Sequence, residues 1–272
     1  DNRLVLKGNL SNPEIEGSLY FYEGSFNKYL IDDAAGDYSY KDGNLRLGSF
    51  LIHALQTELK LSGTASRSKE LDFLLEARKV DLRKMTFPNN VTVAGLVDFS
   101  GSLGGTFAAP VFHGELGSQS IVINGQEFIE IGGTLESTGG RVNKLRASAR
   151  QGEGTFKTDL FLDFDKALFQ GDIEVAGGDL KSLLTLARQD YDIVGALDGR
   201  IVVNEGGKGS GVNIAGSIRG LGVRGIRYKS AEFGVFIHKD VLEIRKMRAE
   251  EEQQGFIAAQ GTIDFRGRGL NL

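Results

Sequence analysis

The residues best suited to chemistry are few in this chain, and they are scattered. His53, His113 and His238 are the only histidines, and each lies in a separate strand-like segment. A metal site or an acid–base site needs partners that converge at a suitable spacing. None of the three histidines has such neighbours in sequence. We therefore interpret them as ordinary strand residues and expect no metal site.

Two further patterns resemble catalytic or binding motifs. Gly206 to Gly211 resembles a phosphate-binding loop, but a Walker motif requires Ser or Thr after the lysine. Gly209 follows Lys208, so the segment predicts a hairpin loop. The acidic runs at 32–33 and 250–252 are adjacent residues, which face opposite ways on a strand. We interpret them as solvated turns. With no nucleophile, base and orienting group to combine, the sequence predicts a protein that is not an enzyme and needs no cofactor.

The composition excludes further classes of function. The chain of 272 residues has a formal net charge of −4, whereas a nucleic-acid surface is normally basic. Cysteine is absent, which excludes thiol chemistry and disulfides. Glycine is abundant, with 38 residues, while proline occurs only 3 times. Single glycines among runs of Val, Ile, Leu and Phe are typical of many short strands joined by tight turns.

Alternating apolar and charged residues dominate the chain. Thr57 to Leu61 places leucines on one face and charges on the other, and the segment from Asp159 to Asp165 does the same. This alternation predicts an all-β fold, an elongated antiparallel sheet with one wetted face. Two short helices are expected, at 81–86 and 179–188, each opening with an Asp-Leu pair that suits a helix N-terminus.

An internal repeat organises the chain. The segment Gly8 to Leu19, with Pro13 inside it, recurs about 97 residues later as Gly105 to Leu116, with Pro110 at the same place. A weaker third copy is expected at 216–225. These copies divide the chain into repeat units at 1–104 and 105–215, with a partial unit at 216–272. No apolar run is long enough for a membrane helix, no signal peptide is evident, and both ends read as cuts through a longer protein.

On this ordered set of motifs the chain resembles the AsmA-like superfamily, in particular its TamB-like members from the translocation and assembly module. The resemblance implies a β-taco, a long sheet curled along its axis around an apolar groove. It also implies a periplasmic segment of an inner-membrane-anchored protein in a diderm bacterium. The expected partners are phospholipid acyl chains and, through other parts of the parent protein, an Omp85-type outer-membrane barrel of the TamA kind.

The apolar stripe of this sheet allows two interpretations. It could be the dry core of a sandwich, or it could line an open groove that holds lipid. Three observations favour the groove: no second class of strands could cap the first, the large apolar residues vary little in size, and tandem units extend one stripe. The predicted groove residues are Leu59, Leu61, Leu160, Leu162, Phe164, Ile173, Val175, Ile201, Val203, Ile263 and Phe265.

A bare apolar stripe of this size needs an apolar occupant. Acyl chains suit it, since each buried methylene contributes about 0.8 kcal/mol. The stripe and the resemblance to the AsmA-like superfamily together predict a module that shields phospholipid acyl chains. The resemblance implies that the module conducts them between the inner and outer membranes. The alternative is a chaperone or scaffold that assists outer-membrane barrel assembly by adding strands to its sheet edge.

Overall fold

The structure is a computed structural model of the chain. It describes residues 3–9, 12–26, 29–54, 57–85, 91–139, 142–163, 168–186, 189, 191–205, 210–239, 241–251, 255–264 and 269–271.

Strands make up nearly all of the described chain. They are β1 (Arg3–Asn9), β2 (Asn12–Phe26), β3 (Tyr29–Lys41), β4 (Asn44–Ala54), β5 (Thr57–Ala65), β6 (Leu71–Asp81), β7 (Val93–Gly105), β8 (Pro110–Ile123), β9 (Gln126–Thr138), β10 (Val142–Gln151), β11 (Gly154–Asp163), β12 (Leu168–Asp179), β13 (Ile193–Glu205), β14 (Gly211–Val223), β15 (Ile226–His238), β16 (Val241–Glu251), β17 (Phe256–Asp264) and β18 (Gly269–Asn271). The predicted all-β class is confirmed.

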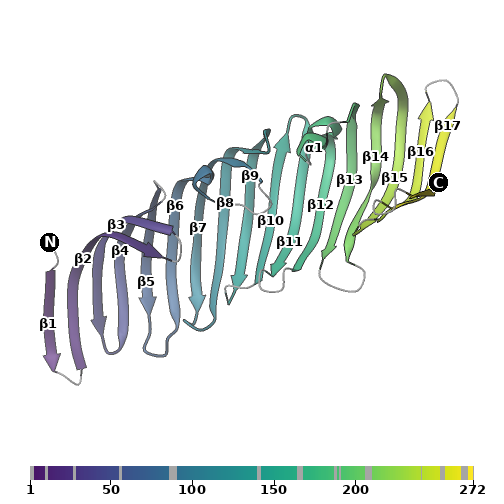
Figure 1. Ribbon diagram of the computed structural model, residues 1–272. Coiled ribbons are helices and arrows are strands. Elements are labelled where there is room, and N and C mark those ends of the chain that lie inside the picture. Colours follow the sequence, from purple (N-terminus) through teal and green to yellow (C-terminus); the bar gives the residue numbers. More distant parts are fainter. Residues whose placement is uncertain are drawn as a thin grey trace. The chain divides into compact units, whose positions relative to one another are not determined.

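The strands form one antiparallel sheet in which neighbours in sequence are neighbours in space. From β1 to β7, and again from β11 to β18, each strand pairs with the next one along the chain (Figure 1). The strands β8, β9 and β10 belong to the same sheet.

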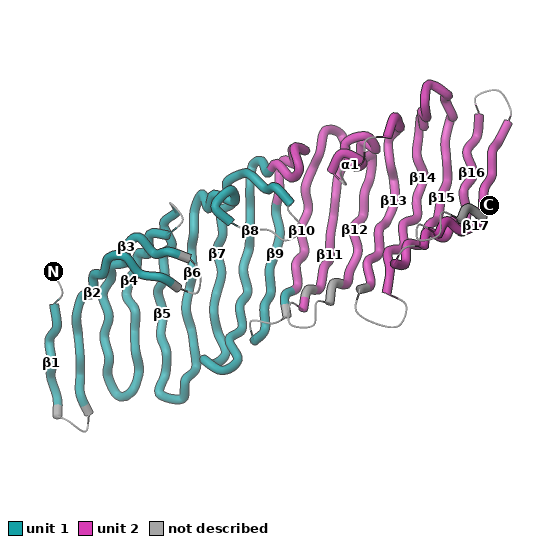
Figure 2. Tube along the Cα trace, in the orientation of Figure 1, with its two compact units in different colours: residues 1–121, 132–143 teal, residues 122–131, 144–272 magenta. Residues whose placement is uncertain are grey.

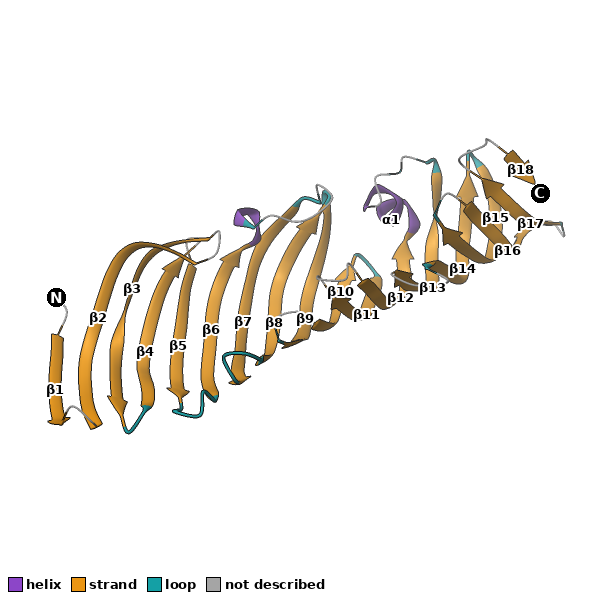
Figure 3. Ribbon diagram, turned by 60° about the horizontal axis from the view of Figure 1, so that its bottom comes forward, coloured by secondary structure: helices purple, strands orange, loops and turns teal. Residues whose placement is uncertain are grey.

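The chain divides into two compact units, coloured separately in Figure 2. Unit 1 contains residues 1–121 and 132–143, and unit 2 contains residues 122–131 and 144–272. Residues 122–131 cover the end of β8 and the beginning of β9, whereas the rest of β9 belongs to unit 1. Within each unit the sheet is open and curled, as predicted (Figure 3).

Both expected helices are present, and both are short. The 3-10 helix η1 (Leu82–Lys84) follows β6, and the helix α1 (Leu180–Leu186) follows β12 (Figure 3). Asp81 caps η1 by accepting a hydrogen bond from the backbone N–H of Arg83 at 3.0 Å. Asp179 accepts one from the backbone N–H of Ser182 at 2.9 Å. The predicted Asp-Leu helix starts are confirmed.

The repeat is visible in the backbone, because a helix follows the sixth strand and then the twelfth. Gly8 and Gly105 both have positive φ, 83° and 74°, and each lies in the strand that precedes a repeated proline. The third copy is placed differently from the expectation. Residues 216–223 lie inside β14, not at the end of a strand as Gly8 and Gly105 do. The backbone also matches the Asn124-Gly125 turn between β8 and β9 with the Arg224-Gly225 turn between β14 and β15, since all four residues have positive φ. These matching turns are about 100 residues apart, so the third copy in the motif does not follow the structural repeat.

Candidate functional site

One face of unit 1 consists of rows of apolar side chains that run across neighbouring strands. Directly opposed residues in a sheet share a face, so the strand register defines these rows. Three rows cross β3 to β7, and a fourth crosses β3 to β6. They are Ala34, Ile52, Leu59, Ala77 and Phe99; Gly36, Phe50, Leu61, Leu75 and Gly101; Tyr38, Leu47, Gly63, Phe73 and Leu103; and Tyr40, Leu45, Ala65 and Leu71.

Unit 2 has an equivalent face built in the same way. Its rows cross β11 to β17, except the last, which begins at β12. They are Leu160, Gly171, Val203, Val212, Ile237, Leu242 and Ile263; Thr158, Ile173, Ile201, Ile214, Val235, Ile244 and Gly261; Phe156, Val175, Gly199, Gly216, Phe233, Met247 and Ala259; and Gly178, Leu197, Ile218, Ala231, Ala249 and Ile257. In each unit we call this set of rows the apolar face.

The register places the predicted groove residues on these faces wherever their side chains are described. Leu59 and Leu61 lie on the apolar face of unit 1. The apolar face of unit 2 carries Leu160, Ile173, Val175, Ile201, Val203 and Ile263. Phe164 and Phe265 lie outside the described residues, as does the side chain of Leu162. Whether these residues contact lipid stays a prediction.

The apolar faces are only partly covered. Val175 is buried, at 5% exposed, but the other described residues of the predicted set are half-buried. Among the described residues no large side chain is completely buried. A packed sandwich core would enclose its central side chains from both sides. The faces therefore have the character of a single layer that lacks a second sheet over it in the described chain.

The opposite face is charged and held by pairs between neighbouring strands. Arg146 contacts Asp159 at 3.1 Å and Arg200 contacts Asp172 at 3.1 Å. The pKa of Arg200 is raised by its hydrogen bond to Asp172. These pairs are exposed, so each contributes little to stability. Their main effect is to make this face polar and solvent-exposed, while the opposite face carries the apolar rows.

His53 lies on this charged face between two carboxylates. Its Nδ1 is 2.8 Å from Asp33 Oδ1, and its Nε2 is 3.7 Å from Glu58 Oε2. The hydrogen bond to Asp33 raises the pKa of His53. The expectation of a solvated turn for the acidic pair is wrong, because Asp32 and Asp33 lie inside β3.

The second acidic run was also expected to be a solvated turn, but Glu250 and Glu251 lie at the end of β16. Residue 252 lies outside the described chain. In the described ranges no group of three or more His, Cys, Asp or Glu side chains is arranged to hold a metal ion. Of the glycine-rich segment, 206–209 lie outside the described residues and Gly211 begins β14.

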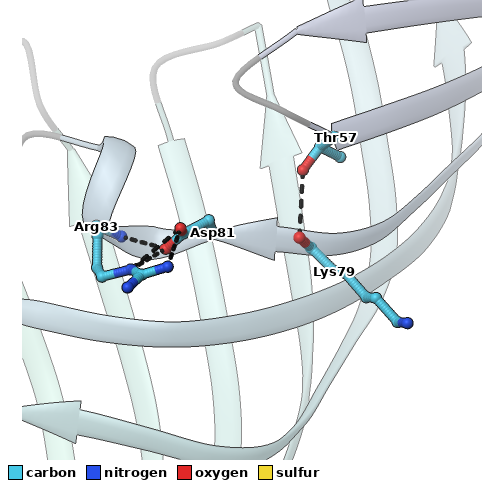
Figure 4. A network of polar contacts seen from close by, with 4 residues as sticks. All are labelled: Thr57, Lys79, Asp81 and Arg83. Carbon is cyan, nitrogen blue, oxygen red and sulfur yellow. Dashed lines mark hydrogen bonds and ion pairs between the residues drawn. The ribbon is translucent and has the colours of Figure 1, made fainter.

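A distorted stretch of β6 leads into η1, and polar contacts fix it on both sides (Figure 4). At Lys79 the backbone has a φ of 56°, and its N–H donates to Asp98 Oδ1 at 2.8 Å. The carbonyl of Lys79 accepts a hydrogen bond from Thr57 Oγ1 at 3.3 Å. In unit 2, the N–H of Gly177 donates to Asp198 Oδ1 at 2.8 Å in the equivalent position. The repeat thus preserves an aspartate that holds the bulge before each helix.

Asp81 anchors the start of η1 with a bidentate ion pair. Arg83 Nε and Nη2 contact its two carboxylate oxygens at distances between 2.6 and 3.1 Å. This hydrogen bonding lowers the pKa of Asp81 to about 2. Asp81 is opposite Leu96 in the register, at the helix end of the apolar face of unit 1. Both carboxylate oxygens of Asp81 therefore accept hydrogen bonds from Arg83.

Sequence reasoning missed much of each apolar face. Bulges between Leu47 and Phe50, and between Ile244 and Met247, interrupt simple alternation. Phe50 was missed because the bulge shifts its parity relative to Leu45 and Leu47. Glycines such as Gly36 were missed because they have no side chain, although the ring of Phe50 lies against Gly36 and fills that gap. The register of the flanking strands is the signal that identifies these residues.

No protein-family model matches the chain, and neither does any curated protein or solved structure. The similarity to the AsmA-like superfamily therefore stays a prediction from its motifs. In the part of the chain that the structure describes, no helix has the length and apolar character needed to cross a membrane.

Proposed function

We propose that the chain is a non-enzymatic module whose apolar faces shield phospholipid acyl chains. The observation that carries this proposal is the set of continuous apolar rows. They combine buried residues such as Phe73 and Val175 with half-buried ones such as Ile201, and they have no second layer over them among the described residues. Apolar surface of this extent is unfavourable in water and is covered in most soluble proteins. An acyl chain would cover it along its length.

The chemistry of the rows favours an acyl chain over a polypeptide. The polar groups in the rows of unit 2 reduce to Thr158, whose hydroxyl already donates to the carbonyl of Asp172 at 3.2 Å. A polypeptide strand laid on such a face would bury backbone N–H and C=O groups without partners there. An acyl chain has no such groups, so it loses nothing on leaving water.

The location and partners follow from the predicted family and belong to the same proposal. A TamB-like module would lie in the periplasm of a diderm bacterium, in a parent protein anchored in the inner membrane. Its apolar faces would conduct phospholipid between the membranes, and other parts of the parent would meet a TamA-like barrel.

A charge introduced on the apolar face tests the proposal. Ile201 lies on the apolar face of β13, and Val202, the next residue, lies on the charged face and is 37% exposed. We expect Ile201→Arg to lower the phospholipid that co-purifies with the protein, measured by native mass spectrometry and lipid extraction. The matched control Val202→Arg should keep the wild-type lipid content.

Each outcome separates the proposal from its rivals. If Ile201→Arg unfolds while Val202→Arg is stable, the face is a closed core, because a buried unpaired charge is costly. If wild-type protein carries no lipid but binds unfolded outer-membrane barrel peptides, the chaperone function replaces the proposed one.

A further inference from the structure

One buried polar atom of unit 2, beside its apolar face, has no hydrogen-bond partner. Gln151, the last residue of β10, is 7% exposed, and its side-chain Oε1 is buried without a hydrogen bond. It is the single side-chain atom of this kind found in the described ranges. Its Nε2 is 3.5 Å from Oε1 of Gln126, the first residue of β9. Buried amide oxygens are almost always hydrogen-bonded, so an exception needs a cause.

The two glutamines lie on the same side of the sheet as the apolar rows. The rings of Phe128 and Phe156 are in edge-to-face contact, with centroids 5.4 Å apart, and Phe156 pairs with Val175 in the apolar rows. Gln126 precedes Phe128 by two residues in β9, so alternation places both side chains on one face. The contact between Gln126 and Gln151 brings Gln151 to that face as well.

This position is next to the helix end of unit 2. Asn124, two residues before Gln126, donates through Nδ2 to the carbonyl of Leu186 at the last turn of α1, at 3.0 Å. The helix has no buried residue of its own, although Leu180 packs against Leu221, Ala231 and Ala249. A short helix with few buried contacts is easily displaced. Its displacement would open this end of the apolar face.

We propose that the Gln126–Gln151 amide pair receives the polar end of a bound amphiphile, with Oε1 of Gln151 accepting a hydrogen bond from an ammonium or hydroxyl head group. This inference rests on the proposed function and adds a head-group preference to it. The acyl chain then lies along the apolar rows, and the head group supplies the donor that Oε1 of Gln151 lacks. A donor-bearing head group gains a hydrogen bond here that a quaternary ammonium cannot form.

The test compares phosphatidylethanolamine with phosphatidylcholine of identical acyl chains, supplied to the delipidated protein as an equimolar mixture in vesicles. Both head groups are zwitterionic, but only the ethanolamine has N–H donors. We expect wild-type protein to take up phosphatidylethanolamine in about fivefold excess, as one hydrogen bond of about 1 kcal/mol would give. Gln151→Leu should abolish this preference by lowering the uptake of phosphatidylethanolamine to that of phosphatidylcholine.

The experiment includes a control variant and a second measurement on the wild-type protein. Gln170→Leu changes a glutamine of β12 that bonds Asn204 and lies opposite Phe161 on the other face, so the preference should be unchanged. If Gln151→Leu does not fold, the N-methylated ethanolamine series bound to wild-type protein gives the answer, because the preference should disappear when the last N–H is replaced. Equal binding of the two lipids by wild-type protein would overturn the head-group site alone. Binding of neither lipid would overturn the proposed function as well.

Discussion

Two glycines show at the residue scale how tightly the strands approach one another. Gly171 in β12 has a φ of 142°, and a Cβ there would lie 2.2 Å from the backbone oxygen of Asp159. Gly234 in β15 has no heavy atom within 4 Å of the same position and no positive φ. The two glycines look alike in sequence but face different constraints.

Replacing these glycines with alanine should therefore give different results. We expect Gly171→Ala to lower the free energy of unfolding by roughly 1–3 kcal/mol, because the backbone must shift and the positive φ is strained. Gly234→Ala should change it by less than about 0.5 kcal/mol. Urea denaturation of both variants measures the difference, and equal losses would contradict the close approach at Gly171.

The ion pair of Asp81 gives a pH-dependent prediction. Its pKa in the folded chain is about 2, below the value of about 3.9 in an unfolded chain. Its stabilising contribution is therefore complete above pH 4 and is lost as the pH falls towards 2. Asp81→Asn should be less stable than wild type at pH 6, and the difference should shrink below pH 4. Asp72→Asn, at an exposed position of the same strand, is the control for the loss of an aspartate from β6. Chemical denaturation at several pH values measures both.

His53 should titrate in the opposite sense. Asp33 raises its pKa in the folded chain, so its contribution to stability is complete below about pH 6.5 and is lost as the pH rises through the folded value. The NMR titration of the His53 ring should give a higher pKa in wild type than in Asp33→Asn. An unchanged pKa would show that Asp33 does not hold the ring.

At the scale of elements, the helix α1 depends on contacts at both ends. Asp179 caps its first turn, and Asn124 bonds its last carbonyl. Asp179→Ala should cost about 0.5–2 kcal/mol in unfolding free energy. Asn124→Ala should increase hydrogen exchange in residues 180–186 and leave the strands unchanged. Strand exchange that rises equally would mean that α1 and the sheet open together.

The sequence predicted the strands and helices far better than it predicted which residues within them contact one another. Asp81 and Asp179 gave both helix starts correctly, because an aspartate before a leucine is a local capping signal. The acidic pair at Asp32 and Asp33 was misread as a turn because its stabilising partner, His53, comes from the neighbouring strand. Bulges and the amide pair of Gln126 and Gln151 depend on contacts between strands, so sequence alone could not place them.

At the scale of the whole molecule, the apolar faces should be detectable in the free protein. A hydrophobic dye such as ANS should bind the delipidated native chain, because large side chains of its apolar rows, such as Ile201 and Ile263, are only half-buried. Added phospholipid should displace the dye without changing the far-UV spectrum. A native chain that binds no dye would mean that the rows are enclosed. The all-β open sheet was predictable from sequence, because the alternation of apolar and polar residues in strands is a periodic property.

The pairing of each strand with its successor has a consequence for synthesis. A β-strand that must wait for a distant partner leaves its edge exposed until that partner emerges, and such long loops slow folding. Here the partner of β2 is β3, and the partner of β13 is β14, so each partner is the next strand to be synthesised. Low contact order of this kind lets the chain fold vectorially, one hairpin at a time, onto the strands that precede it.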